Sequence, residues 1–116
     1  MIHFTFFRRG GVFYGFEEQG HAGFAESGND IVCSAVSAMT MLIINAIEVT
    51  FASDVDYHID EKTTDIRVKA MGALPEVEAD EKKRFAIAGL IEAYYLQLND
   101  MLEDYYDYLD VDVKDD

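Results

Sequence analysis

A histidine and the only cysteine of the chain lie close together in the sequence, on either side of a polar stretch. His21 follows Gly20, and Cys33 comes twelve residues after the histidine, with Asp30 between them. A cysteine thiolate is a strong nucleophile, and a histidine beside it can accept and later donate the proton that peptide cleavage requires. These residue types therefore fit a Cys–His pair for nucleophilic catalysis.

Helical spacing predicts that the cysteine lies near the start of a helix. Apolar residues recur at intervals of three and four over residues 31–49, which predicts a well-buried helix. Asp30, or Asn29 beside it, is a suitable N-cap, and Cys33 would then be the third helical residue. There, unpaired backbone N–H groups and the helix dipole favour the thiolate and can stabilise an oxyanion. Ser37, one turn further on, would share the face of Cys33 and could add a hydrogen bond.

The same residues also fit interpretations without chemistry. A lone cysteine in an apolar helix is often a packing residue, and a loop histidine is often only solvated. His3 and His58 fall in strand patterns and are expected to be structural. A metal site built from His21, Asp30 and Cys33 matches no familiar ligand spacing, and we expect no metal or other cofactor.

Strand and helix patterns alternate around the catalytic candidates. Apolar alternation in residues 2–7 and 12–16 predicts a β-hairpin, and the glycine-rich residues 17–30 predict a long loop. The elements that follow are the helix over 31–49, a second hairpin at 55–59 and 66–70, a helix over 78–105 and a strand at 109–113. The order β-β-α-β-β-α-β predicts an α+β fold, with two helices on one face of a mixed or antiparallel sheet. We expect residues 1–116 to form a single domain.

Composition and charge limit the kinds of partner that the protein can bind. The 116 residues carry a formal net charge of −14, which opposes direct binding to nucleic acid and fits either a basic protein partner or simple solubility. A single cysteine excludes a disulfide within the chain. No apolar run approaches the ~20 residues that span a bilayer, and the N-terminal order of aromatics before arginines is the reverse of a signal peptide. We therefore expect a cytoplasmic protein with no membrane partner.

The segments around the histidine and the cysteine resemble the ribosomal-processing cysteine protease family. The resemblance rests on Gly-His-Ala at 20–22, a short glycine-containing loop, and Asp-Ile-Val-Cys-Ser-Ala-Val-Ser at 30–37. The order and size of the predicted elements agree with the family over the whole chain. The resemblance implies that His21 and Cys33 are the catalytic pair. It also implies a surrounding site made of Gly20, Asp30 and Ser37.

The resemblance carries expectations about substrate and assembly. The family is described as homodimeric and as removing a short N-terminal extension from a large-subunit ribosomal protein, with the histidine on a mobile loop, here residues 19–29. A bulky aromatic residue precedes the bond that is cut, so an apolar pocket is expected near the catalytic pair. Ser34 stands where alanine is more usual. Because ribosomal proteins are generally basic, an acidic enzyme would attract its substrate.

Two other classes of function remain open at this stage. A non-catalytic ribosome-assembly factor could use the acidic surface to bind a basic ribosomal protein, and it would leave Cys33 unreactive. A redox-sensing thiol protein would respond to oxidation without hydrolysing peptides. Alkylation of Cys33 against pH separates these classes, because a catalytic thiolate reacts well below the ordinary cysteine pKa of ~8.5.

Overall fold

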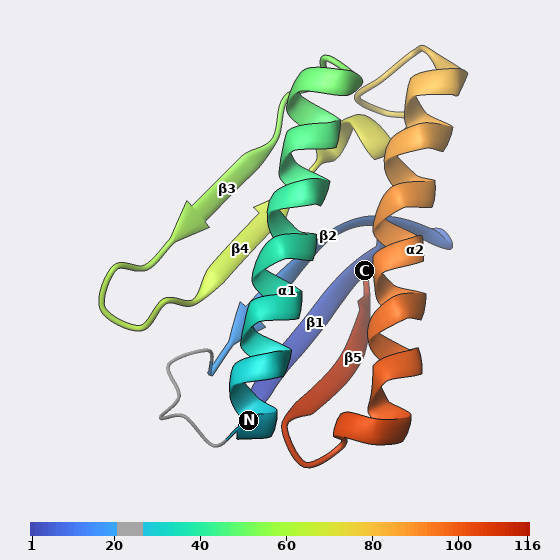
Figure 1. Cartoon of the computed structure of the whole chain (residues 1–116). Helices are drawn as coiled ribbons and strands as arrows, with labels where there is room; N and C mark the ends of the chain where they lie inside the picture. Colours follow the sequence, from blue (N-terminus) through green and yellow to red (C-terminus); the bar gives the residue numbers. More distant parts are fainter. Residues whose placement is uncertain (21–26) are drawn as a thin grey trace.

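The main elements follow the order predicted from the sequence (Figure 1). The computed structural model describes residues 1–20 and 27–116, and for residues 27–30 the backbone alone. The elements are β1 (Ile2–Arg9), β2 (Val12–Gln19), α1 (Ser27–Asn45), β3 (Asp56–Ile59), β4 (Ile66–Lys69), α2 (Glu81–Tyr105) and β5 (Leu109–Asp115). Short π-helical and 3₁₀ turns occupy Ala46–Thr50 and Met71–Ala73. The predicted α+β class and element order are confirmed.

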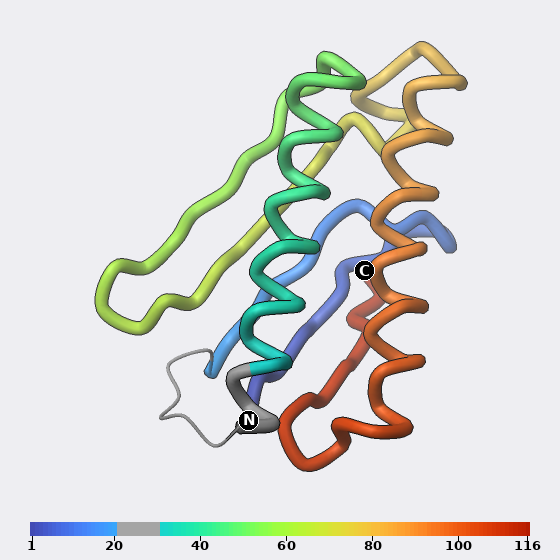
Figure 2. The backbone as a smooth tube through the Cα atoms, viewed as in Figure 1, coloured from blue at the N-terminus to red at the C-terminus, as the bar shows by residue number. Residues whose placement is uncertain are grey.

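The strands form one mixed sheet in the order β3-β4-β2-β1-β5. Both hairpins are antiparallel, β2 pairs antiparallel with β4, and β5 runs parallel to β1. The first hairpin turns at Gly10 and Gly11, whose φ values of 57° and 80° suit a two-residue turn and cost glycine nothing. Both helices cover the same face of the sheet, as predicted, and leave the other face open (Figure 2).

The core between the sheet and the helices is rich in aromatic rings. Phe4, Phe6 and Phe16 are fully buried beneath the helices. Tyr94 of α2 meets all three rings edge-on, with centroids 5.3–5.9 Å apart. Edge-to-face pairs of this kind add about 0.5–1.5 kcal/mol each beyond the burial of the rings. This cluster fixes α2 above the centre of the sheet.

Strand β2 is longer than predicted, and its side chains change the side of the sheet to which they point partway along the strand. The pairing register shifts after Phe7, and Tyr14 lies against Phe7, with ring centroids 6.1 Å apart. Simple alternation had put Tyr14 on the same face as Phe16, but a β-bulge moves one residue to the other side. The strand continues through residues 17–19, which the sequence had assigned to the loop.

Helix α1 begins earlier than predicted. It runs from Ser27 to Asn45 and continues into a π-helical turn, against the predicted 31–49. Asp30 is therefore inside the helix and is not its N-cap, and Cys33 is the seventh helical residue and not the third. Serine, asparagine and aspartate are all favourable near a helix start, where N–H groups have no intrahelical partner. A run of such residues does not fix which one begins the helix.

One side of α1 is apolar and exposed, contrary to the prediction of a well-buried helix. Ile31 and Leu42 of α1 are 55% and 61% exposed, and Val49 of the π-helical turn that follows is 73% exposed. The segment Ile31–Thr50 is long and apolar enough to cross a membrane by length and composition alone, which corrects the statement that no apolar run approaches that length. The core helix of a water-soluble protein passes the same test. Here the opposite side of α1 packs into the core.

Helix α2 starts at a side-chain cap. The carboxylate of Asp80 accepts a hydrogen bond from the backbone N–H of Lys82 at 3.0 Å. The predicted start at residue 78 was three residues early, because Arg84 instead donates to the backbone carbonyls of Glu78 and Ala79. The predicted end at residue 105 is confirmed.

The acidic end of the chain, whose role the sequence left open, pairs with two arginines of β1. Arg8 donates to Asp115 at 2.6 and 2.8 Å, and Arg9 donates to Asp116 at 3.1 and 3.2 Å. The hydroxyl of Tyr14 donates to Asp116 at 2.7 Å. These hydrogen bonds lower the pKa of both aspartates. They also hold the end of β5 against β1.

Candidate active site

Cys33 lies in the second turn of α1, at the edge of the core. Its side chain is half-buried and packs against the core cluster. Val32 and Val36, its neighbours on the helix, are fully buried and anchor this part of α1 to the sheet. Ser37 is half-buried one turn beyond Cys33, as the helical spacing predicted. A thiol that is anchored and still partly accessible suits a nucleophile.

Gly20 fixes the point where β2 ends and the histidine-bearing segment begins. Its φ of +76° lies in the left-handed region that favours glycine. A Cβ atom at this position would overlap the backbone carbonyl oxygen of Met1. The Gly20 N–H donates to the side chain of Asp65 at 3.3 Å. This position therefore requires glycine for two steric reasons, and its place in the site stays a prediction.

The predicted general base and one supporting residue lie outside the described side chains. His21 belongs to residues 21–26, and Asp30 is described by its backbone alone. Chain connectivity still ties both to the site, because His21 follows Gly20 directly in the sequence. Asp30 precedes Cys33 by about one helical turn. The contact between His21 and Cys33 stays a prediction.

The early start of α1 changes the expected source of oxyanion stabilisation. The N–H groups without intrahelical partners belong to the first four residues of a helix, here residues 27–30. The backbone N–H of Cys33 therefore lies beyond this group. The helix dipole also acts mainly within the first turn. The N–H of Cys33 is therefore not one of the free amides, and the role of helix N-terminal amides in holding the oxyanion stays a prediction.

Comparison with known proteins decides the family. The sequence profile described as "Cysteine protease Prp" matches residues 1–110, which include the histidine-bearing segment and Cys33. The chain belongs to the cysteine protease Prp family. It is therefore a cysteine protease, and the resemblance seen in the sequence is confirmed. No curated protein sequence matches the chain.

Solved structures agree with this membership in the Prp family. SMU.848 from Streptococcus mutans is 31% identical, with a TM-score of 0.81, and the match covers 100% of this chain and 99% of that one. The essential ribosomal processing protease Prp from S. aureus, in complex with a substrate peptide, is 19% identical with a TM-score of 0.80 and coverages of 98% and 100%. The same S. aureus protease with a covalently linked product peptide gives a TM-score of 0.77 at 21% identity, again with coverages of 98% and 100%.

This Prp family chain also buries a carboxyl group that the sequence analysis missed. Glu18 is 0% exposed and lies on the helix-facing side of β2, paired with Phe4 across the sheet. The Thr40 hydroxyl donates to it at 3.4 Å, and the Thr40 and Tyr94 hydroxyls are 2.8 Å apart. Burial raises the pKa of Glu18 to about 7. Extending the strand alternation from Phe16 would have placed Glu18 in the core.

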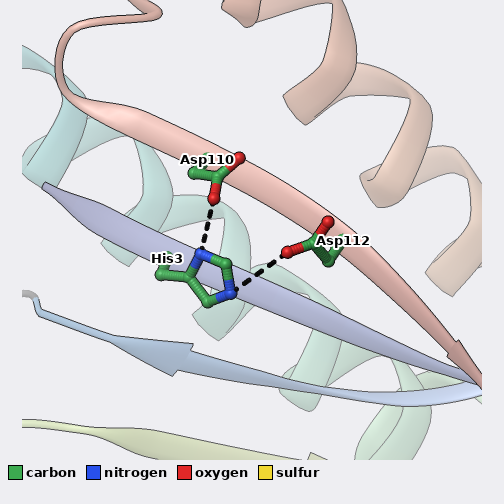
Figure 3. Close-up of side chains that lie close together, drawn as sticks. All are labelled: His3, Asp110 and Asp112. Carbon is green, nitrogen blue, oxygen red and sulfur yellow. Dashed lines mark ion pairs between the residues drawn. The ribbon is translucent and has the colours of Figure 1, made fainter.

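A histidine and two aspartates gather on the open face of the sheet (Figure 3). His3 of β1 lies between Asp110 and Asp112 of β5, with its Nδ1 2.9 Å from one carboxylate and its Nε2 3.4 Å from the other. Ligand atoms from all three residues lie within 4.8 Å of one another. Both ring nitrogens face carboxylates, so His3 of β1 links two aspartates of β5. The structural role of His3 stays a prediction.

Proposed function

We propose that this Prp family protease removes a short N-terminal extension from a large-subunit ribosomal protein in the cytoplasm. The observation that carries the proposal is the family match over residues 1–110, which spans both predicted catalytic residues. The fold agrees with a ribosomal processing protease that was solved with a substrate peptide. The half-buried Cys33 supports the role of nucleophile. His21 is the proposed general acid and base.

The proposed reaction proceeds in two covalent steps. The Cys33 thiolate attacks the scissile carbonyl carbon and forms a thioester as the C–N bond breaks. The protonated imidazole of His21 donates its proton to the departing amine. His21 then accepts a proton from water, which hydrolyses the thioester and regenerates the thiol. Gly20, Asp30 and Ser37 support this site.

The direct test is cleavage of a peptide that spans the N-terminal extension of the matching ribosomal protein. Mass spectrometry after incubation with the wild type should show a single cut at one bond, and the Cys33→Ala variant should leave the peptide intact. Intact peptide and intact full-length precursor with the wild type would refute the proposal and favour the assembly-factor alternative.

Acidic groups near the end of β2 favour the proposal that the substrate is basic. A cavity of about 360 Å³ beside the second hairpin is lined by eight residues. Four of its lining residues are acidic, namely Glu17, Asp56, Asp60 and Asp65, and one, Arg67, is basic and pairs with Glu17. Asp65 is also the residue that accepts from the Gly20 N–H at the start of the histidine-bearing segment. A basic peptide approaching the site therefore meets negative charge.

Salt should weaken this attraction. Between about 20 and 500 mM salt, we expect kcat/KM for a basic peptide to fall about tenfold, because screening shortens the range of the attraction. The matched control is the same peptide with its basic residues outside the cleavage site replaced by glutamine, whose kcat/KM should change less than twofold. Equal salt dependence for the two peptides would show that the acidic groups do not steer the substrate.

We also propose that the enzyme is a homodimer that pairs through the outer faces of α1 and α2. The two helices run side by side in opposite directions (Figure 1). Leu42 of α1 and Phe85 of α2 are 61% and 81% exposed. Residues 31–47 contain no charged side chain, so the α1 part of this face is apolar in a chain of net charge −14. A second copy would bury that face.

Introducing charged residues on this face should prevent dimer formation. Leu42→Lys and Phe85→Lys together introduce two charges that would lose hydration in a dimer, and desolvating them costs several kcal/mol. We expect sedimentation velocity to show a dimer for the wild type and a monomer for the double variant. Val77→Lys, at an exposed residue outside both helices, is the control and should remain dimeric. A monomeric wild type at high concentration would exclude the proposed pairing.

A further inference from the structure

Glu18 joins three elements beneath the helices. It extends from β2 toward α1 and α2, and it is fully buried. The Thr40 hydroxyl of α1 is 3.4 Å from Oε1 of Glu18 and 2.8 Å from the hydroxyl of Tyr94 in α2. Tyr94 in turn donates to the backbone carbonyl of Val36 at 3.1 Å. The carboxyl group thus takes part in a chain of polar contacts that returns to α1.

Counting protons along this chain favours a neutral carboxyl. The three contacts Glu18–Thr40, Thr40–Tyr94 and Tyr94–Val36 need one proton each, and the two hydroxyls supply two. A protonated Glu18 supplies the third: its O–H donates to Thr40, Thr40 donates to Tyr94, and Tyr94 donates to the carbonyl. When Glu18 is ionised, Thr40 donates to the carboxylate instead. Tyr94 must then leave one of its two contacts without a proton.

The described residues around the carboxyl group also oppose its negative charge. Across the sheet its neighbours are the apolar Phe4 of β1 and Ile66 of β4. The titratable groups that act on it include Tyr94 from α2 and Asp65 from the turn before β4. Burial raises the pKa of Glu18 most, the Thr40 hydrogen bond lowers it, and the charge of Asp65 raises it further.

Glu18 is linked to both proposed catalytic residues. Thr40 follows Cys33 by seven residues, two helical turns, so both point to the same side of α1 about 10 Å apart. His21 follows Glu18 by three residues along the chain, a span of at most about 10 Å. The carboxyl group therefore connects the strand that leads to the histidine with the helix that carries the cysteine.

We propose that Glu18 is a positioning residue for peptide cleavage, and that its carboxyl proton controls activity. Protonated Glu18 completes the hydroxyl chain and holds α1 in place over β2. Ionised Glu18 breaks that chain and places a buried negative charge beside Thr40, two helical turns from Cys33, where it opposes formation of the thiolate. This inference rests on the proposed function, because it concerns the reaction at Cys33 and His21.

The test compares the pH profiles of the wild type and Glu18→Gln. Glutamine keeps the size of the side chain and can donate to Thr40 at every pH. A charge about 10 Å away in a protein interior shifts a thiol pKa by about one unit. We therefore expect the ratio of kcat/KM at pH 8.5 to that at pH 6 to be about three- to tenfold higher for Glu18→Gln. Superimposable profiles would overturn the proposal.

A control variant and an assay without substrate show whether a shift in the pH profile comes from Glu18. Glu61→Gln removes the same charge from an exposed residue of the turn between β3 and β4, and its profile should match the wild type. The rate of Cys33 alkylation by iodoacetamide against pH needs no substrate, and it should show the same Glu18→Gln shift. If no peptide is cut but alkylation shifts, the proposed function fails and the Glu18 link stands. If peptide is cut but alkylation and kcat/KM are unshifted, the Glu18 link fails alone.

Discussion

Replacing Cys33 by alanine should lower kcat/KM for the peptide by at least about 10⁴-fold, because no other group can form the thioester. The fold should survive, since the side chain is only half-buried at the edge of the core. We expect the free energy of unfolding to change by no more than about 1 kcal/mol. Cleavage of the peptide, read by mass spectrometry, and urea unfolding measure the two effects separately.

Matched variants separate chemistry from packing. Ser34→Ala changes the next residue, which is exposed on the same helix turn, and it should retain wild-type activity. His21→Ala should also abolish cleavage, and it should slow alkylation of Cys33 near neutral pH because the thiolate loses its cationic partner. Substantial turnover by Cys33→Ala would rule out the covalent mechanism. Wild-type turnover by His21→Ala would remove the histidine from it.

The element order was predictable because each element has a strong local signal. Alternating apolar residues mark β1 and β2, and the three- and four-residue spacing marks α1 and α2. The parallel return of β5 beside β1 was not predictable from such patterns, because alternation gives the faces of a strand but not its neighbour. Only the described structure assigns Ile2 to Leu109 and Phe6 to Val113 across that pair.

The errors arose where local rules leave more than one solution. Several polar residues before Cys33 are suitable helix starts, so composition could not choose Ser27 over Asp30. Apolar residues all around α1 suggested burial, but burial depends on what packs against each side, and Leu42 has no such neighbour within the described residues of one chain. Because glycines follow Gln19, residues 17–19 were predicted to belong to the loop.

The position of Glu18 shows how one boundary error hides a functional residue. A glutamate in a loop would be solvated, and its charge would need no explanation. The same glutamate in β2, two residues after Phe16, must face the core, where desolvation costs several kcal/mol unless it is neutral or paired. The sequence supplies Thr40 and Tyr94 as its partners, but residues 22 and 76 positions away cannot be linked to it by spacing.

Replacing Glu18 by glutamine should stabilise the protein at pH 8 and have little effect near pH 4.5. The pKa of Glu18 is about 7 in the folded protein, against an ordinary value of 4.5. A raised folded-state pKa means that the contribution of Glu18 to stability is complete below pH 4.5 and is lost as the pH rises through 7. The difference of about 2.5 pH units corresponds to about 3 kcal/mol. Glutamine is neutral at every pH, so the free energy of unfolding of Glu18→Gln does not fall in this way.

Urea unfolding followed by circular dichroism at several pH values between 4.5 and 8.5 measures the effect. The wild type should lose stability relative to Glu18→Gln across this range, most steeply between pH 5 and 7. Asp115 and Asp116 have lowered pKa values and contribute the opposite dependence at more acid pH, but they are present in both proteins and cancel in the difference. The stability difference between the wild type and Glu17→Gln should not change with pH over this range. Parallel stability curves for wild type and Glu18→Gln would mean that the carboxyl group is ionised in the folded protein throughout, and the hydroxyl chain would then lack its third proton.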